Sequence, residues 1–286
     1  MMKASPFRTA VIATVWGWLA LFVLGPALLL FVTSFLSRHE SELLTLAPTI
    51  GNYARLLDPL YLGVLLQSLG LAGLATALCL LVGYPFAYAL SRQPDWAKPL
   101  LLVLLMVPFW TNSLVRTFAL KILFANRGVI NTTLISSGLI DAPLPMLYNT
   151  FAVVTGLVYV MLPFMVLPLY AVFEDLRRDV LQASHDLGAN SLQTFRHVVL
   201  PLTLPGIIAG SLLVFLPSIS SFYVVDVLGG ARVTLAGNVI KNQFLDARDW
   251  PFGAAMSVSL TLLMGVLLWA YHLSRRRLGP AVKEAA

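Results

Sequence analysis

The sequence has few charged residues and only one cysteine. Asp, Glu, Lys and Arg make up 11% of its 286 residues, 58% are hydrophobic, and the mean hydropathy is +0.84. A soluble globular domain carries about 25% charged residues. The single cysteine, Cys79, excludes an intrachain disulfide and a cysteine-based metal cluster, and its apolar surroundings predict a packed thiol. The composition therefore indicates a protein that lies in a membrane.

Motifs for nucleotide binding and for common catalytic chemistries are also missing. The sequence has no GxxxxGK followed by Ser or Thr, so the chain cannot hold the phosphates of ATP in such a loop. It has no GxSxG nucleophile elbow and no HExxH zinc motif. The four histidines, His39, His185, His197 and His272, show no ligand spacing with carboxylates or cysteines. We therefore expect no catalytic residue, no metal site and no cofactor bound by this chain.

Six long stretches lack any charged side chain. They are residues 9–37, 59–91, 99–115, 142–173, 197–225 and 250–274. A helix needs about 20 apolar residues to cross the hydrocarbon core, so each stretch can hold one crossing. Runs such as "LLLVLLMV" (100–107) do not alternate in polarity as the strands of a membrane β-barrel do. The sequence therefore predicts an all-α polytopic membrane protein with six transmembrane helices.

These helices form a single transmembrane domain over residues 1–286. The approximate ranges that we expect for the helices are 11–36, 63–90, 98–118, 149–172, 203–226 and 252–274.

The distribution of basic residues predicts the orientation in the membrane. With an even number of crossings, both termini lie on the side that also holds the loop 174–202. That side carries 11 of the 19 Lys and Arg residues, three of them at 275–277 directly after the last helix. Positively charged segments stay in the cytoplasm. We therefore expect both termini and the loop 174–202 in the cytoplasm, and no nucleic-acid partner is needed to explain the net charge of +6.

The first half of the loop 174–202 has a helical pattern. Leu176, Val180, Ala183 and Leu187 recur at spacings of four, three and four, which places them on one helical face. Gly188 follows at the position where a helix often ends in a left-handed residue. A helix closed by a glycine turn is therefore expected here.

The second half of the loop shows a new start signal and a stop signal. Ser191 can cap a second short helix. Leu200-Pro201 and Pro205-Gly206 then close this helix and return the chain to the membrane. His185 and His197 are expected on solvated faces. The loop is thus predicted to be a structured element that can dock on a soluble partner.

Residues 182–201 resemble the EAA signature of the membrane subunits of binding-protein-dependent ABC importers. That signature reads EAA, three residues, G, nine residues, I, one residue, LP. Here Gln182-Ala183-Ser184, Gly188 and 198–201 ("VVLP") have the same spacing. Gln182 stands in place of Glu, which removes one negative charge, Ser184 in place of Ala, and Val198 in place of Ile.

The resemblance extends over nearly the whole chain and is greatest to the first permease subunit of the spermidine/putrescine, or polyamine, importers. The similar segments are "NYARLLDPLY" (52–61), "VPFWTNSLVRTFALK" (107–121), "LVYVMLPFMVLPLY" (157–170), "LPLTLPGIIAG" (200–210) and "GNVIKNQFLDARDWPFGAA" (237–255). The resemblance implies a type I ABC importer permease fold in the bacterial inner membrane, surrounded by lipid. It implies a heterodimer with a second permease subunit, two cytoplasmic ATPase subunits that bind ATP and Mg, and a periplasmic polyamine-binding protein. It also implies a cytoplasmic element that couples the chain to the ATPases: Gln182, Ala183, Ser184, Asp186, Gly188, Leu200 and Pro201.

Three further side chains suit a pathway for a flexible polycation, which needs carboxylates and aromatic faces. Tyr223 and Asp226 are three residues apart near the outer end of the fifth span, and Trp110 lies near the outer end of the third. The alternative is a solvated carboxylate and two aromatic residues of the membrane interface. Arg116 and Lys121 would repel a polycation, so we expect them to support the structure or to contact the binding protein.

Other functions are compatible with parts of this pattern. An importer of another small solute, such as an opine, an aminophosphonate or a metal complex, would have the same fold. An ion-coupled secondary transporter would carry several ionisable residues at the midplane, and the spans have almost none. A membrane-embedded enzyme would need a catalytic motif. The preference between putrescine and spermidine is expected to lie largely in the separate binding protein.

Overall fold

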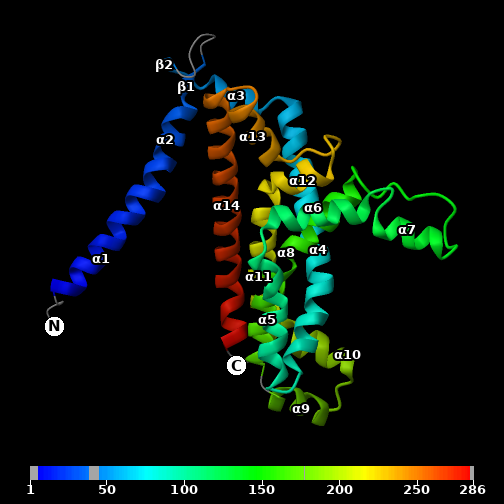
Figure 1. Cartoon of the computed structure of the whole chain (residues 1–286). Helices are drawn as coiled ribbons and strands as arrows, with labels where there is room; N and C mark the ends of the chain where they lie inside the picture. The colour runs from blue at the N-terminus through cyan, green and yellow to red at the C-terminus, as the bar shows by residue number, and fades with distance from the viewer. Residues whose placement is uncertain (1–5, 39–44, 177, 284–286) are drawn as a thin grey trace. The chain divides into compact units, whose positions relative to one another are not determined.

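The computed structural model describes residues 6–38, 45–176 and 178–283, and most of them are helical (Figure 1). The α-helices are α1 Pro6–Leu19, α2 Gly25–Ser34, α3 Gly51–Leu56, α4 Pro59–Ser91, α5 Ala97–Trp110, α6 Ser113–Phe124, α7 Val129–Ser136, α8 Thr150–Glu174, α9 Arg178–Asp186, α10 Ser191–Thr194, α11 Leu200–Ser220, α12 Phe222–Leu228, α13 Ala236–Leu245 and α14 Trp250–Lys283. Two π-helical turns, Ala20–Leu24 and Phe195–Val199, join α1 to α2 and α10 to α11. The short strands β1 Leu36–Ser37 and β2 Thr45–Pro48 pair antiparallel.

Five helical segments of the described part of the chain are long and apolar enough to cross a membrane. Their bounds are Val11–Ser34, Pro59–Ser91, Thr150–Glu174, Ser191–Ser220 and Trp250–Tyr271. A sixth crossing is present only if the bent pair Ala97–Trp110 and Ser113–Ser136, which turns by 89°, counts as one span. The predicted class, an all-α polytopic membrane protein, is confirmed.

The third span differs from the single helix expected over 98–118. Pro108 lies in the last turn of α5, and Thr111 is extended (φ −87°, ψ 146°). The side chain of Asn112 then accepts a hydrogen bond from the Leu114 N–H at 2.8 Å and caps α6. Because a capping side chain satisfies one of the free N–H groups at a helix start, this apolar segment can break inside the membrane region.

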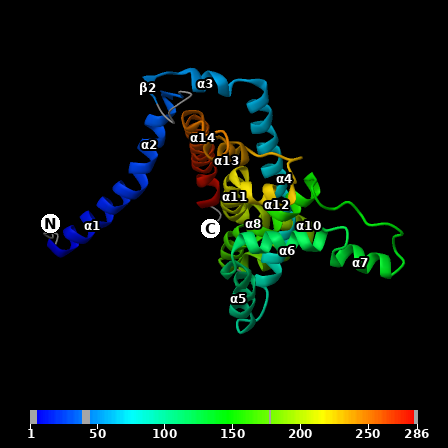
Figure 2. The same cartoon turned by 45° about the horizontal axis from the view of Figure 1, so that its top comes forward.

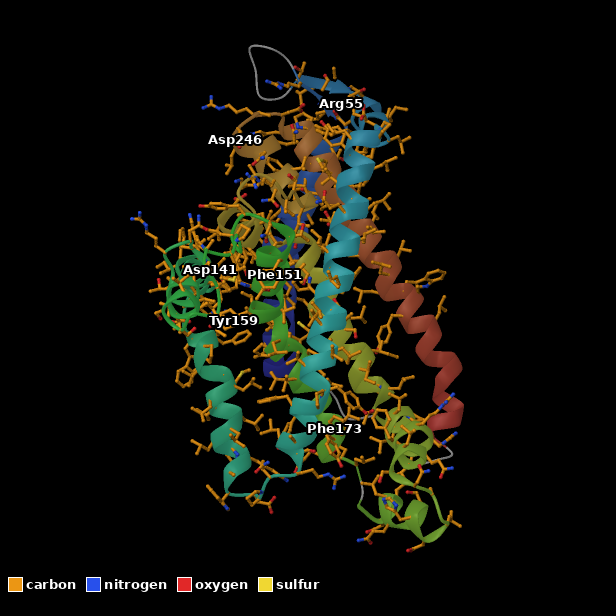
Figure 3. All side chains as sticks on the ribbon, turned by 90° about the vertical axis from the view of Figure 1, so that its right-hand side faces the viewer. Arg55, Asp141, Phe151, Tyr159, Phe173 and Asp246 are labelled. Atoms are coloured by element: carbon orange, nitrogen blue, oxygen red, sulfur yellow. The ribbon has the colours of Figure 1, made fainter. Side chains whose placement is uncertain are left out.

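The described chain forms two compact units. One comprises the residues up to Leu62 together with Val239–Leu267, and the other comprises Gly63–Asn238 together with the residues from Leu268. In the first unit, the buried Asn52 donates hydrogen bonds to the carbonyls of Ser34 (3.0 Å) and Leu36 (2.8 Å). Arg55, labelled in Figure 3, donates to Asp249 at 2.9 Å. These contacts tie α3 to the strand and to the start of α14.

The second unit is built around α8. Leu157, Met165 and Leu169 of this helix are fully buried, and α11 packs along it. The helix α6 contacts both α8 and α12, and Figure 2 shows it crossing α8. Gly210 allows α11 its close approach, because a Cβ there would lie 2.8 Å from Met165 Sδ and 3.1 Å from the Met165 carbonyl oxygen. Small residues at such contacts are typical of membrane helix pairs.

Replacing Gly210 with Val should destabilise the packing of α11 on α8. The added side chain meets backbone as well as a side chain, so the helices must separate, at a cost of about 1–3 kcal/mol. We expect a lower melting temperature of the purified subunit in detergent. Gly70→Val is the matched control, because no atom lies within 4 Å of a Cβ there. Equal melting temperatures for the two variants would contradict the close contact.

Candidate functional site

The segment between α8 and α11 folds into two short helices that meet at a glycine. Gly188 has φ +82°, which lies in the left-handed region that favours glycine. Its N–H donates to the His185 carbonyl at 2.9 Å, and the N–H of Ala189 donates to the Ser184 carbonyl at 3.1 Å. The left-handed glycine that the sequence predicted after α9 is therefore present.

The second helix begins one residue earlier than expected. Asn190, rather than Ser191, is the cap: its side chain accepts from the Gln193 N–H at 2.9 Å. The Gln193 side chain in turn accepts from the Asn190 N–H at 2.9 Å, which completes a capping box. Asn and Ser are equally good N-caps. Asn190 is the cap because Gln193, three residues later, can complete a capping box with it.

The sequence predicts that Leu200 and Pro201 end this second helix, but the structure shows that they do not. The chain stays helical from Ser191 to Ser220. A π-helical turn over Phe195–Val199 widens the helix, and the Leu200 N–H donates to the Phe195 carbonyl. Pro201 then lies in the first turn of α11, where a missing N–H costs little.

Only part of the predicted apolar face turns inward: Leu176 packs against the hydrophobic core. Leu187 is 89% exposed and Ala183 is exposed, whereas Leu181 packs against the hydrophobic core and Ser184 is buried. The Ser184 hydroxyl donates to the Leu181 carbonyl at 2.8 Å and shares a 3.0 Å hydrogen bond with the Thr194 hydroxyl. Because this bond holds α9 to α10, tertiary contact rather than the apolar spacing decides which face turns inward.

The tip of the loop is an exposed surface with two large apolar side chains. Leu187 and Leu192, on either side of the Gly188 turn, are 89% and 74% exposed. Gln182 and Asp186 are exposed beside them. Exposed apolar residues gathered on a polar loop are typical of a surface that binds another protein. We name the segment 182–192 the tip.

The two histidines of this region are exposed, and each has a backbone partner. The Nδ1 atom of His185 lies 3.1 Å from the Ala189 carbonyl oxygen, and that of His197 lies 3.1 Å from the Gln193 carbonyl oxygen. Within residues 6–38, 45–176 and 178–283, no group of three or more His, Cys, Asp or Glu residues is placed to hold a metal ion.

A second feature is a break in the fifth span. The helix expected over 203–226 divides at Ser221, whose ψ of 65° is not helical, into α11 and α12. The Ser221 hydroxyl donates to the Pro217 carbonyl at 2.8 Å. The buried Asn238 donates to the Phe222 carbonyl at 3.0 Å and to Asp226 Oδ1 at 2.6 Å, and accepts from the Leu235 N–H at 3.1 Å. Asn238 thus holds the break and the carboxylate together.

The three candidate pathway residues lie on α12 and at the end of α5. Tyr223 and Asp226 are on α12; Tyr223 packs against the hydrophobic core, and Asp226 is exposed. Trp110 is the last residue of α5 and is 80% exposed, at the bend that leads into α6. Because α6 packs against α12, the bend of the third span and the break of the fifth belong to adjacent elements.

Residues 79–283 match the family described as binding-protein-dependent transport system inner membrane component. The chain belongs to this family. It is 51% identical to the spermidine/putrescine transport system permease protein PotB of Salmonella typhimurium (strain LT2) over 284 residues, which cover 99% of each chain. It is 52% identical to the Escherichia coli (strain K12) protein of the same name over 272 residues, 95% of this chain and 99% of the relative.

The fold of this family member is also found in a solved transporter. A chain of a bacterial alginate ABC transporter, solved in complex with an alginate pentasaccharide-bound periplasmic protein, superimposes with a TM-score of 0.77. The match covers 95% of both chains at 14% identity, so it shows the fold alone. The predicted importer permease fold is confirmed.

In this permease, three spans meet near the tip through aromatic residues that the sequence analysis did not single out, and Phe195 follows the tip by three residues. The ring of Tyr84 on α4 lies 5.0 Å from that of Phe173 on α8 and 5.9 Å from that of Phe195. The Tyr84 hydroxyl also shares a 2.9 Å hydrogen bond with the Thr203 hydroxyl of α11. Figure 3 labels Phe173 near the end of α8. Such rings, 4.5–7 Å apart, couple the elements that carry them.

A cavity and an ion pair lie at the same end of the permease. The cavity has a volume of about 420 Å³ and is lined by α4, α9 and the π-helical turn, with Tyr88 and Leu181 among its residues. Lys98 at the start of α5 binds Glu174 at the end of α8 (2.8 Å) and also Asp95 (3.1 Å). The spacing of Tyr84 and Tyr88, four residues apart on one helical face, was the available sequence signal.

Proposed function

We propose that this permease imports polyamines, spermidine and putrescine, across the bacterial inner membrane as part of an ATP-driven complex. The observation that carries the proposal is the identity of 51–52%, over 95% of the chain or more, with relatives named as spermidine/putrescine permeases. The complex would contain a second permease subunit, two ATPase subunits that bind ATP and Mg, and a periplasmic polyamine-binding protein. This chain contributes no catalytic residue and binds no cofactor in that complex.

The tip is the proposed docking element for the ATPases. Its exposed members are Gln182, Ala183, Asp186 and Gly188, and the two leucines add apolar surface. Ser184 holds the tip from inside, and Leu200 and Pro201 connect it to the span in the first turn of α11. Because the ATPases lie in the cytoplasm, the proposal places the tip and both termini on that side.

The break at Ser221 is the proposed contact point for substrate. The C-terminal end of α11 presents carbonyl oxygens and the negative end of the helix dipole, both of which attract an ammonium group. Asp226 adds a formal charge on α12, and Tyr223 and Trp110 supply aromatic faces on adjacent elements. The carboxylate is held in place by Asn238 at 2.6 Å.

Transport would follow alternating access. Closure of the ATPases on ATP moves the tip, and the rings of Tyr84, Phe173 and Phe195 pass that movement to α4 and α8. The pathway between the two permeases then opens outward and afterwards inward. The chain moves and binds but carries out no chemistry.

Asp226→Asn should lower spermidine uptake about tenfold, which corresponds to about 1.4 kcal/mol of binding. The amide keeps an oxygen that can accept from Asn238, so the local fold stays intact while the charge is lost. Initial uptake rates of labelled spermidine measure the effect, and ATPase copurification should not change. Asp141→Asn is the control, because that carboxylate is exposed on the loop after α7. Unchanged transport kinetics would remove Asp226 from the pathway.

The proposed substrate is tested in a bacterial strain that lacks its own polyamine uptake. Expression of this permease with its partner subunits and binding protein should restore accumulation of labelled spermidine or putrescine. If cells accumulate another solute, such as molybdate, and neither polyamine, the proposed substrate is wrong. The assignment to ATP-driven importers would still hold.

A further inference from the structure

Arg116 on α6 is buried without a hydrogen-bond or ion-pair partner among the described residues. Its exposed fraction is 8%, and its Nε atom is enclosed with no acceptor. The guanidinium carbon lies 5.0 Å from the ring centre of Phe109 and 6.0 Å from that of Tyr159. These rings stabilise a cation, but they do not supply the oxygen acceptors that a guanidinium needs.

Arg116 lies beside an apolar part of α8, away from the ends of that helix. Tyr159 lies nine residues after the start of α8, or about 14 Å at 1.5 Å per residue. Figure 3 shows it between Phe151 and Phe173 along this helix. From Thr150 to Phe173 the helix has no charged residue. A charge in such apolar surroundings is costly unless it is paired, and intramembrane ionisable residues normally have a partner.

Other sources of a counter-ion can be set aside. Lipid phosphates lie at the membrane surface, beyond the ends of the hydrocarbon core. A periplasmic binding protein approaches from that surface too, and the proposed substrate is itself a cation. Aromatic side chains next to Arg116 are partly open: Tyr159 is 42% exposed, and Phe164, which packs on Phe109, is 37% exposed. A second membrane subunit can cover them.

We propose that Arg116 forms an ion pair with a carboxylate of the second permease subunit. This inference rests on the proposed function, which supplies that subunit. The rings of Phe109 and Tyr159 hold the planar guanidinium in one orientation, and an arginine fixed in this way binds a carboxylate through two parallel hydrogen bonds. Arg116 is then a determinant of permease pairing rather than a residue that contacts substrate.

The test measures how much second permease copurifies with a tagged form of this chain from membranes that contain the whole complex. Arg116→Gln and Arg116→Leu should lower the amount at least tenfold, and Arg116→Lys less. Lys121→Gln is the matched control, because it removes a half-buried cation from the same helix beside Tyr148 and should leave pairing unchanged. The membrane level of each tagged variant reports on its folding.

A second arm identifies the carboxylate. Each Asp and Glu in the spans of the second permease is neutralised in turn in complexes that carry Arg116→Leu. One of these changes should restore copurification, because it removes the carboxylate that Arg116→Leu leaves without a partner. If Arg116→Leu does not accumulate in membranes, the same scan is carried out with the unchanged chain. Neutralising the one acid that pairs with Arg116 should then lower copurification of the second permease tenfold. Pairing that survives in every Arg116 variant, or a scan in which no acid has an effect, overturns the proposal.

Different results would contradict the proposed polyamine import and the proposed ion pair of Arg116. Spermidine uptake by the unchanged complex tests the proposed function and does not depend on Arg116 variants. Normal uptake together with normal pairing of Arg116→Leu would overturn the ion pair alone. An unchanged chain that holds no second permease would overturn both.

Discussion

Gly188→Val should lower polyamine uptake at least about tenfold while the chain still inserts into the membrane. Gly188 has φ +82°, and a residue with a Cβ pays about 1–2 kcal/mol for that conformation, with a β-branched residue the least suited. No atom lies within 4 Å of a Cβ at this position, so the substitution acts on the backbone and not by crowding. The tip would turn away from the ATPase, and we expect a loss of uptake of about tenfold or more, measured with labelled spermidine.

Gly188→Asn is the matched control for this prediction. Asparagine adopts the left-handed conformation far more readily than valine and adds a side chain of similar size. Uptake by this variant should stay within about twofold of the unchanged chain, with equal amounts of both variants in the membrane. Normal uptake by Gly188→Val would remove the glycine turn from coupling, and equal loss in both variants would point to a contact made at the Cβ position instead.

Leu187→Glu combined with Leu192→Glu should release the ATPase subunits from the complex. The two side chains are 89% and 74% exposed, so they contribute little to the stability of the chain itself. In the proposed complex they are covered, and a buried carboxylate without a partner is costly. We expect the copurified ATPase to fall at least tenfold and uptake to be lost with it.

The control for this double variant is Leu139→Glu, which changes an equally exposed leucine just after α7. ATPase copurification and uptake should not change in that variant. A double variant that retains its ATPases would show that the docking surface lies elsewhere on the chain.

The sequence predicted the features that depend on local composition and backbone preference. Runs without charge coincide with the long apolar helices of the described residues, because crossing the hydrocarbon core requires such runs whatever their neighbours are. The left-handed Gly188 was predictable because few other residues adopt that conformation easily. The resemblance to ABC importer permeases predicted the family, which the match over residues 79–283 confirms.

The sequence did not predict features that depend on contacts between distant segments. The breaks at Thr111–Asn112 and Ser221 leave the mean hydropathy of each span high, so charge-free runs do not reveal them. The inward face of α9 is decided by the bond between Ser184 and Thr194, ten residues apart. Asn238 stands twelve residues after the Asp226 that it binds, and nothing in the sequence shows that these two side chains meet.

The surroundings of Arg116 also depended on the fold. The sequence shows a cation near an apolar run, but only the structure shows that its guanidinium lies near the rings of Phe109 and Tyr159 and that its Nε atom has no acceptor among the described residues. Charge reasoning from the sequence gave it a supporting role or a contact with the binding protein. Its place beside Tyr159 of α8 favours the supporting role, which the proposed ion pair makes specific.

The most direct test of the proposed function uses the purified complex in proteoliposomes. The complex contains this permease, the second permease and the ATPases, and ATP hydrolysis is measured while the periplasmic binding protein is added empty or loaded. We expect the binding protein loaded with spermidine or putrescine to stimulate hydrolysis and to drive accumulation of the labelled polyamine. Accumulation by this chain alone, driven by an ion gradient without ATP, would contradict the account.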